Sequence, residues 1–123
     1  MANILIIEDD AAIRALVRVH LEKAAHTVQE AENGQLGIDM AQASVPDLIV
    51  LDINMPVMDG TRTMKALRGD AATRAVPVVA LSAVTVPEMR DDMHQLGCNA
   101  YVSKPINFDI LMEHIDTFTG RKT

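Results

Sequence analysis

The amino-acid sequence predicts a doubly wound α/β domain, in which a parallel five-stranded sheet carries helices on both faces. Short apolar runs alternate five times with amphipathic stretches, which is the pattern of parallel strands joined by helices. Residues that cap or break helices stand at the transitions, and five strand–helix units use up the chain. At 123 residues we therefore expect one domain with one core, five helices and the strand order 2-1-3-4-5.

The five expected strands are short and mostly apolar. The first and third are unbroken, which predicts strands buried on both faces, whereas the second is weaker. Pro46 introduces the third run and Pro77 opens the fourth. The strands are expected at 4–7, 27–30, 48–51, 77–81 and 100–103.

Each expected helix has a start signal, a stop signal or an apolar stripe. Asp10 and Asn107 can cap the first and last helices, and Asn33-Gly34 turns into the second. Pro87 fits the first turn of the fourth helix, which Gly97 can end. The helices are expected at about 11–24, around Leu36 and Met40, around Met64 and Leu67, from 87 to 97, and from 107 to about 118. The apolar stripe of the first helix is expected at Ile13, Leu16, Val17, His20 and Leu21.

Composition excludes several classes of function. The net charge of −6, the pI near 5.0 and the 2% aromatic content argue against nucleic-acid binding. No apolar run approaches the roughly 18 residues of a membrane span, and the N-terminus lacks the basic start of a signal peptide. The single cysteine, Cys98, cannot form an internal disulfide, so we expect a cytoplasmic protein.

Polar residues follow four of the predicted strands. Glu8 and Asp9 follow the first strand, Asp52 the third, Ser82 the fourth and Lys104 the fifth. In an open α/β sheet, ligands bind beyond the carboxyl ends of the strands, near the point where the strand order reverses. We therefore expect these five side chains to meet at one edge of the sheet.

Three carboxylates at one edge predict a cation site. Two unit charges about 4 Å apart repel by roughly 4 kcal/mol at an effective dielectric constant near 20. An all-oxygen site with few protein ligands suits Mg²⁺. Asp52 can then act as a nucleophile toward a phosphoryl group, with Lys104 and Ser82 contacting its oxygens. Taken alone, each residue is more often a helix cap, a turn or a solvated side chain; their joint placement favours function.

Four motifs resemble the bacterial response-regulator receiver family, which includes the stand-alone chemotaxis-type regulators. The resemblance extends from about residue 3 to residue 118 and implies a flavodoxin-like fold. The motifs are ILIIEDD at 4–10, DLIVLDINMPVMDG at 47–60, PVVALSA at 77–83 and AYVSKP at 100–105.

The resemblance implies a role for each acid. Asp52 matches the family's phosphoacceptor, and Asp9 and Asp52 match its metal carboxylates. Glu8 matches an acid that usually acts through metal-bound water, although aspartate is more frequent there. Asn54 matches the residue whose main-chain carbonyl completes the Mg²⁺ site.

The resemblance also implies a switch. Ser82 and Lys104 match the hydroxyl and the lysine that contact the phosphoryl group, and Tyr101 matches the aromatic residue that turns inward with the hydroxyl. The Lys104–Pro105 peptide bond is commonly cis in this family. The output face is built from the fourth helix, the fifth strand and the fifth helix. Phe108 and Met112 either flank an exposed docking patch on that face or extend the core stripe of the last helix.

The expected function is that of a phosphoacceptor signalling protein rather than an enzyme. Residues 1–119 would form the receiver domain and 120–123 a tail. A sensor histidine kinase or a histidine phosphotransfer protein would supply the phosphoryl group, docking along the first helix and the loop after the fifth strand. Val84 is apolar where some receivers carry a polar group, which predicts slower spontaneous loss of phosphate than a glutamate at this position would give.

Two other functions are weighed against this one. A haloacid-dehalogenase-type hydrolase also uses an Asp nucleophile with Mg²⁺, but it needs an acid two residues later, where this chain has Asn54. A receiver-like adaptor that binds partners without phosphorylation is the second alternative, and the complete set of acids argues against it.

Overall fold

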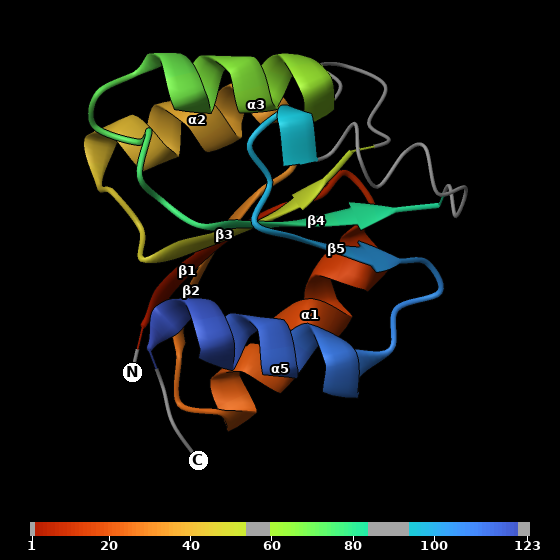
Figure 1. Ribbon diagram of the computed structural model, residues 1–123. Coiled ribbons are helices and arrows are strands. Elements are labelled where there is room, and N and C mark those ends of the chain that lie inside the picture. Colours follow the sequence, from red (N-terminus) through yellow and green to blue (C-terminus); the bar gives the residue numbers. More distant parts are fainter. Residues whose placement is uncertain (1, 54–59, 84–93, 121–123) are drawn as a thin grey trace.

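The chain folds into three layers, a parallel sheet between two pairs of helices (Figure 1). The structure, a computed structural model, describes residues 2–53, 60–83 and 94–120. The elements are β1 (Asn3–Ile7), α1 (Ala11–Lys23), β2 (Thr27–Ala31), α2 (Gly34–Ala43), β3 (Leu48–Asp52), α3 (Gly60–Gly69), β4 (Val78–Ser82), β5 (Ala100–Ser103) and α5 (Phe108–Thr119). The strand order is β2-β1-β3-β4-β5, which confirms the predicted order.

Both faces of the sheet are buried, which explains why its strands are continuous apolar runs. In β1, Leu5 and Ile7 belong to the core cluster between the sheet and the helices α2 and α3. Ile4 and Ile6 belong to the cluster between the sheet and the helices α1 and α5. β3 and β4 divide their side chains in the same alternating way. In Figure 1, α2 and α3 lie above the sheet and α1 and α5 below it.

The described residues contain four helices rather than the five expected. The expected helix from Pro87 to Gly97 falls mostly on residues 84–93, outside the described part of the chain; residues 94 and 95 have helical backbone. Gly97 has a φ of 97°, a conformation that suits glycine at a helix end. None of the helices in the described ranges is long and apolar enough to cross a bilayer.

Three helices begin at side-chain caps, and the two that the sequence predicted, Asp10 and Asn107, are confirmed. The Asp10 carboxylate accepts hydrogen bonds from the backbone N–H groups of Ala12 and Ile13 at the start of α1. Asn33 and Asn107 cap α2 and α5 in the same way.

The predicted apolar stripe of α1 is partly wrong. Val17 and Leu21 are buried, but Leu16 is 52% exposed because it lies one residue round the helix from this buried pair. His20 is half-buried, with Nδ1 2.8 Å from the carbonyl oxygen of Leu16, so it is a packed histidine with a hydrogen bond.

The packing of α5 against α1 decides between the two alternatives for Phe108 and Met112. Phe108 and Met112 pack against the core cluster with the buried Leu111 and Ile115. The Phe108 ring stacks on His20 of α1 at a centroid distance of 4.0 Å. The two residues therefore extend the core instead of forming a docking patch.

Candidate functional site: an acidic cluster at the carboxyl ends of the strands

Strand register brings three carboxylates together. Ile7 pairs with Leu51, so the next residues, Glu8 just after β1 and Asp52 at the end of β3, lie beside each other. One carboxylate oxygen from each of Glu8, Asp9 and Asp52 lies within 4.8 Å of the other two. Glu8 and Asp52 are buried, at 0% and 1% exposure, whereas Asp9 is exposed. The cluster is thus open to solvent on the Asp9 side.

Ser82, the last residue of β4, and Lys104, which follows β5, reach the same edge. The Lys104 ammonium lies 3.1 Å from Oδ2 of Asp52 and 3.3 Å from Oε1 of Glu8. Its backbone N–H donates to the carbonyl oxygen of Ser82 at 2.7 Å, which fixes the start of the loop after β5. Ser82 is fully buried. Four strands therefore deliver the five predicted side chains to one edge, as the sequence analysis predicted.

Crowding changes the protonation of these groups. Burial, followed by the hydrogen bond and the charge of Asp52, raises the pKa of the Glu8 carboxyl to about 8, while Lys104 acts in the opposite direction. Burial lowers the pKa of Lys104, but its hydrogen bond to Asp52 and the charges of Asp52 and Glu8 outweigh burial and raise the pKa overall.

The donor set fits a hard divalent cation. Carboxylate oxygens are the ligands that Mg²⁺ prefers, and a partly open site leaves room for the waters it retains. A bound cation would offset both the burial of Glu8 and the negative charge of Asp52, the two effects that raise the pKa of Glu8. Glu8, Asp9 and Asp52 could therefore hold Mg²⁺.

Not every predicted site residue can be placed. Asn54 and Val84 lie outside the described residues. Tyr101, the expected switch residue, is half-buried on β5. The Lys104–Pro105 peptide bond is cis, as the resemblance implied.

The sequence analysis missed Arg14, which lies behind the acidic turn. Its guanidinium donates to the carbonyl oxygens of Glu8 and Asp9 and pairs with Glu30 on β2. Glu30 is sixteen residues away in the chain, so no local pattern indicated the contact.

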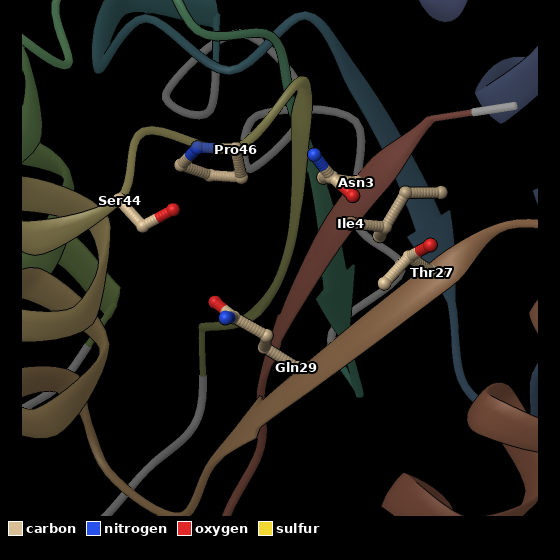
Figure 2. A pocket seen from close by; sticks show the side chains of 6 residues that line it. All are labelled: Asn3, Ile4, Thr27, Gln29, Ser44 and Pro46. Atoms are coloured by element: carbon tan, nitrogen blue, oxygen red, sulfur yellow. The ribbon is translucent and has the colours of Figure 1, made fainter.

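A hollow lies at the opposite edge of the sheet, at the amino ends of the strands (Figure 2). It measures about 150 Å³ and is lined by Asn3, Ile4, Thr27, Gln29, Ser44 and Pro46. These lining side chains carry no formal charge, so this hollow lacks the carboxylates and the ammonium group of the acidic cluster.

A family model described as the response regulator receiver domain matches residues 4–116. This chain belongs to the response-regulator receiver family. Receiver domains are signalling domains that bind Mg²⁺ at an acidic pocket and interact with histidine kinases or phosphotransfer proteins and with downstream targets.

Individual relatives agree with this assignment. The polar-differentiation response regulator DivK of Brucella anthropi is 32% identical over 118 residues, 96% of each chain. The chemotaxis protein CheY4 of Vibrio cholerae is 30% identical with a TM-score of 0.90, over 96% of this chain and 98% of that one. The receiver domain of a sensor histidine kinase from Pseudomonas aeruginosa is 26% identical with a TM-score of 0.88, over 97% and 98% of the two chains. That domain is described with a magnesium ion in its active-site cleft.

Proposed function

We propose that this chain is a single-domain response regulator that accepts a phosphoryl group on Asp52 and changes its protein partners in response. A sensor histidine kinase or a histidine phosphotransfer protein supplies the group. The observation that carries the proposal is the contact of one ammonium, from Lys104, with both buried carboxylates, Asp52 and Glu8. Such a cation beside a carboxylate nucleophile is what transfer of a phosphoryl group requires.

The transfer exchanges one bond to phosphorus for another. A carboxylate oxygen of Asp52 attacks phosphorus while the bond from phosphorus to the donor's imidazole nitrogen breaks. The electron pair stays on that nitrogen, and the product is an aspartyl phosphate. Mg²⁺ held by Glu8, Asp9, Asp52 and the Asn54 carbonyl would neutralise charge on the phosphoryl oxygens. Lys104 contacts one of these oxygens, and the Ser82 hydroxyl donates to another.

The response is a change on the face that contains β5 and α5. Ser82 moves toward the new oxygens, and Tyr101 follows it inward. A hollow of about 470 Å³ already lies on this face, lined in part by Tyr101, Ile110 and Phe118. Ile110 is 44% exposed and offers an apolar contact to a partner, whereas Phe108 and Met112 are half-buried and pack against the core. We propose that downstream proteins bind there.

The extent and location of the protein are part of the same proposal. The family match to residues 4–116 supports a receiver domain at 1–119 followed by a tail at 120–123. We expect the domain to work in the cytoplasm, without direct binding to nucleic acid or membrane.

Mass spectrometry of the intact protein after incubation with Mg²⁺ and acetyl phosphate tests the proposal. We expect a phosphoryl adduct on the wild type and on Asp39→Asn, which removes an exposed carboxylate from α2. Asp52→Asn should carry none. A folded wild type without an adduct would refute the phosphoacceptor role and favour an adaptor that acts without phosphorylation.

A further inference from the structure

The guanidinium of Arg14 lies against the main chain of the turn between β1 and α1. Its Nη1 donates to the carbonyl oxygen of Glu8 at 2.8 Å and to that of Asp9 at 3.3 Å. These are two of the three residues whose carboxylates form the acidic cluster. The Arg14 side chain is 17% exposed; its contact with the Glu8 carbonyl is partly buried, whereas its contact with the Asp9 carbonyl lies at the surface.

Glu30 of β2 orients this guanidinium. Its Oε1 lies 3.3 Å from Nε of Arg14, while its Oε2 pairs with Arg18, one helical turn further along α1. A planar guanidinium that binds a carboxylate through Nε has few orientations left for its other nitrogens. Glu30 therefore directs Nη1 of Arg14 toward the two carbonyls.

The peptide group that accepts the hydrogen bond from Arg14 at Asp9 also faces the carboxylate of Glu8. The carbonyl of Asp9 and the N–H of Asp10 belong to one peptide group, and that N–H points to Oε2 of Glu8 at 3.5 Å. An Arg14 cation on the oxygen polarises this peptide and strengthens its N–H as a donor. On the other side of the turn, the N–H of Glu8 donates to the carbonyl oxygen of Ala31 at 3.1 Å. The turn is thus held from β2 and from α1.

We infer that Arg14 is a positioning residue, which holds the main chain of Glu8 and Asp9 so that their carboxylates converge on Asp52 before a cation or a phosphodonor arrives. This inference rests on the proposed function, since it assigns a purpose to the convergence. It follows from geometry because Arg14 contacts the backbone of the acids and no contact of Arg14 with their carboxylates is seen in the described residues. A site held in its working geometry loses less order when its ligand binds.

The test compares Arg14→Gln with Arg18→Gln. Both variants remove one positive charge and one partner of Glu30, but only Arg14 contacts the turn. The probe is Mg²⁺, and the readouts are its binding isotherm and the rate of adduct formation from acetyl phosphate against Mg²⁺ concentration. Arg14→Gln should raise the half-saturating Mg²⁺ concentration about tenfold, as loss of an outer partner typically does. The rate at saturating Mg²⁺ should return close to that of the wild type.

Arg18→Gln should stay within about twofold of the wild type, because exposed ion pairs contribute little. Equal Mg²⁺ dependence in the two variants would overturn the inference. If Arg14→Gln does not fold, Arg14→Lys and Arg18→Lys replace the pair, since one ammonium cannot reproduce the three donor contacts of Arg14. If neither Arg14 variant folds, the residue serves the fold as a whole and the inference is overturned.

Amide hydrogen exchange in metal-free protein separates this inference from the proposed function. The amides of Glu8, Asp9 and Asp10 should exchange faster in Arg14→Gln than in Arg18→Gln. A wild type that binds no Mg²⁺ and accepts no phosphoryl group would refute the proposed function. The inference about Arg14 would then be judged only from amide exchange at the turn. Equal exchange in Arg14→Gln and Arg18→Gln would overturn that inference.

Discussion

The ammonium group of Lys104 bridges Asp52, at 3.1 Å, and Glu8, at 3.3 Å, so the end of β5 is tied to the ends of β3 and β1. Lys104 thereby neutralises charge that a bound cation would also neutralise. A cation and Lys104 consequently compete for these carboxylates until a phosphoryl oxygen gives Lys104 another partner. Under the proposed function, the same lysine weakens cation binding beforehand and stabilises the phosphoryl group during transfer.

Lys104→Gln should therefore separate Mg²⁺ binding from phosphorylation. Because the competing charge is gone, the variant should bind Mg²⁺ at least as tightly as the wild type. Its rate of adduct formation at saturating Mg²⁺ should fall about a hundredfold, as when a preorganised donor is removed. Lys65→Gln, which removes an exposed charge from α3, is the control and should match the wild type in both measurements. Weaker Mg²⁺ binding by Lys104→Gln would contradict the competition.

Glu8 should make metal-free stability depend on pH. Its pKa is about 8 in the folded protein against an ordinary 4.5, so between these pH values the folded state holds a proton that the unfolded state has released. The free energy of unfolding should then fall as pH rises from about 4.5 to 8 and level off above 8. Denaturant unfolding in EDTA at several pH values measures this.

Glu8→Gln is the matched variant, because it keeps the shape of the side chain without the titrating proton. Its unfolding free energy should depend less on pH than that of the wild type in the same window. Parallel curves for the two proteins would show that Glu8 titrates normally. Saturating Mg²⁺ should reduce the wild-type loss toward pH 8, since metal binding requires the ionised carboxylate.

The sheet and its polar edge were predictable because both depend on local signals. Continuous apolar runs indicate strands buried on two faces, and parallel strands place the residues that follow them at one edge. That rule is sufficient to bring Glu8, Asp52 and Lys104 together. The identity of the site follows from topology and short motifs, with little contribution from long-range side-chain packing.

Helix faces were less predictable, because α5 carries apolar residues around much of its circumference. Phe108 and Ile110 are both apolar, yet Phe108 packs on His20 of α1 and Ile110 is 44% exposed. Which of these two side chains is buried depends on the side of α5 that faces α1. The contact of Arg14 with Glu30 was hidden for a related reason, since it joins a helix to a strand that is distant in the chain.

Ser82 should couple phosphorylation to Tyr101. The chain has one tyrosine and no tryptophan, so its intrinsic fluorescence reports Tyr101. Acetyl phosphate with Mg²⁺ should change this fluorescence in the wild type. Ser82→Ala should still form the adduct but show a much smaller change, because it lacks the hydroxyl that we propose moves toward the phosphoryl group. Ser103→Ala, at the position that pairs with Ser82 in β5, should behave like the wild type. A full fluorescence change in Ser82→Ala would remove Ser82 from the switch.

Phe108 should stabilise the packing of α5 on α1. Phe108→Ala loses the stack on His20 and contacts with the core, so we expect a loss of about 2 kcal/mol in the free energy of unfolding. Ile110→Ala, on the exposed side of the same helix, should cost less than about 1 kcal/mol. Denaturant unfolding at constant pH compares them. Equal stabilities would mean that Phe108 is not a packing residue, and would reopen its role as part of a docking patch.

Gly37 should be required for α2 to lie close to β1. A Cβ at this position would lie 2.3 Å from Cδ1 and 2.6 Å from Cγ1 of Ile7, which is fully buried and cannot move aside freely. Gly37→Ala should therefore lower the free energy of unfolding by about 1–3 kcal/mol, the usual cost of overpacking a core. Because Ile7 directly precedes Glu8, a shift of Ile7 should disturb the acidic cluster. The variant should therefore also accept a phosphoryl group from acetyl phosphate more slowly than the wild type.

Gly69→Ala is the control for Gly37→Ala, since a Cβ on this residue of α3 would meet nothing within 4 Å. Its stability should stay within about 0.5 kcal/mol of the wild type or rise slightly, because alanine favours the helix more than glycine does. Urea unfolding of both variants in the presence of EDTA excludes any contribution from bound metal. If Gly37→Ala unfolds at the same urea concentration as Gly69→Ala, Ile7 yields to the new methyl group. The close approach of α2 then does not constrain the strand that carries Glu8.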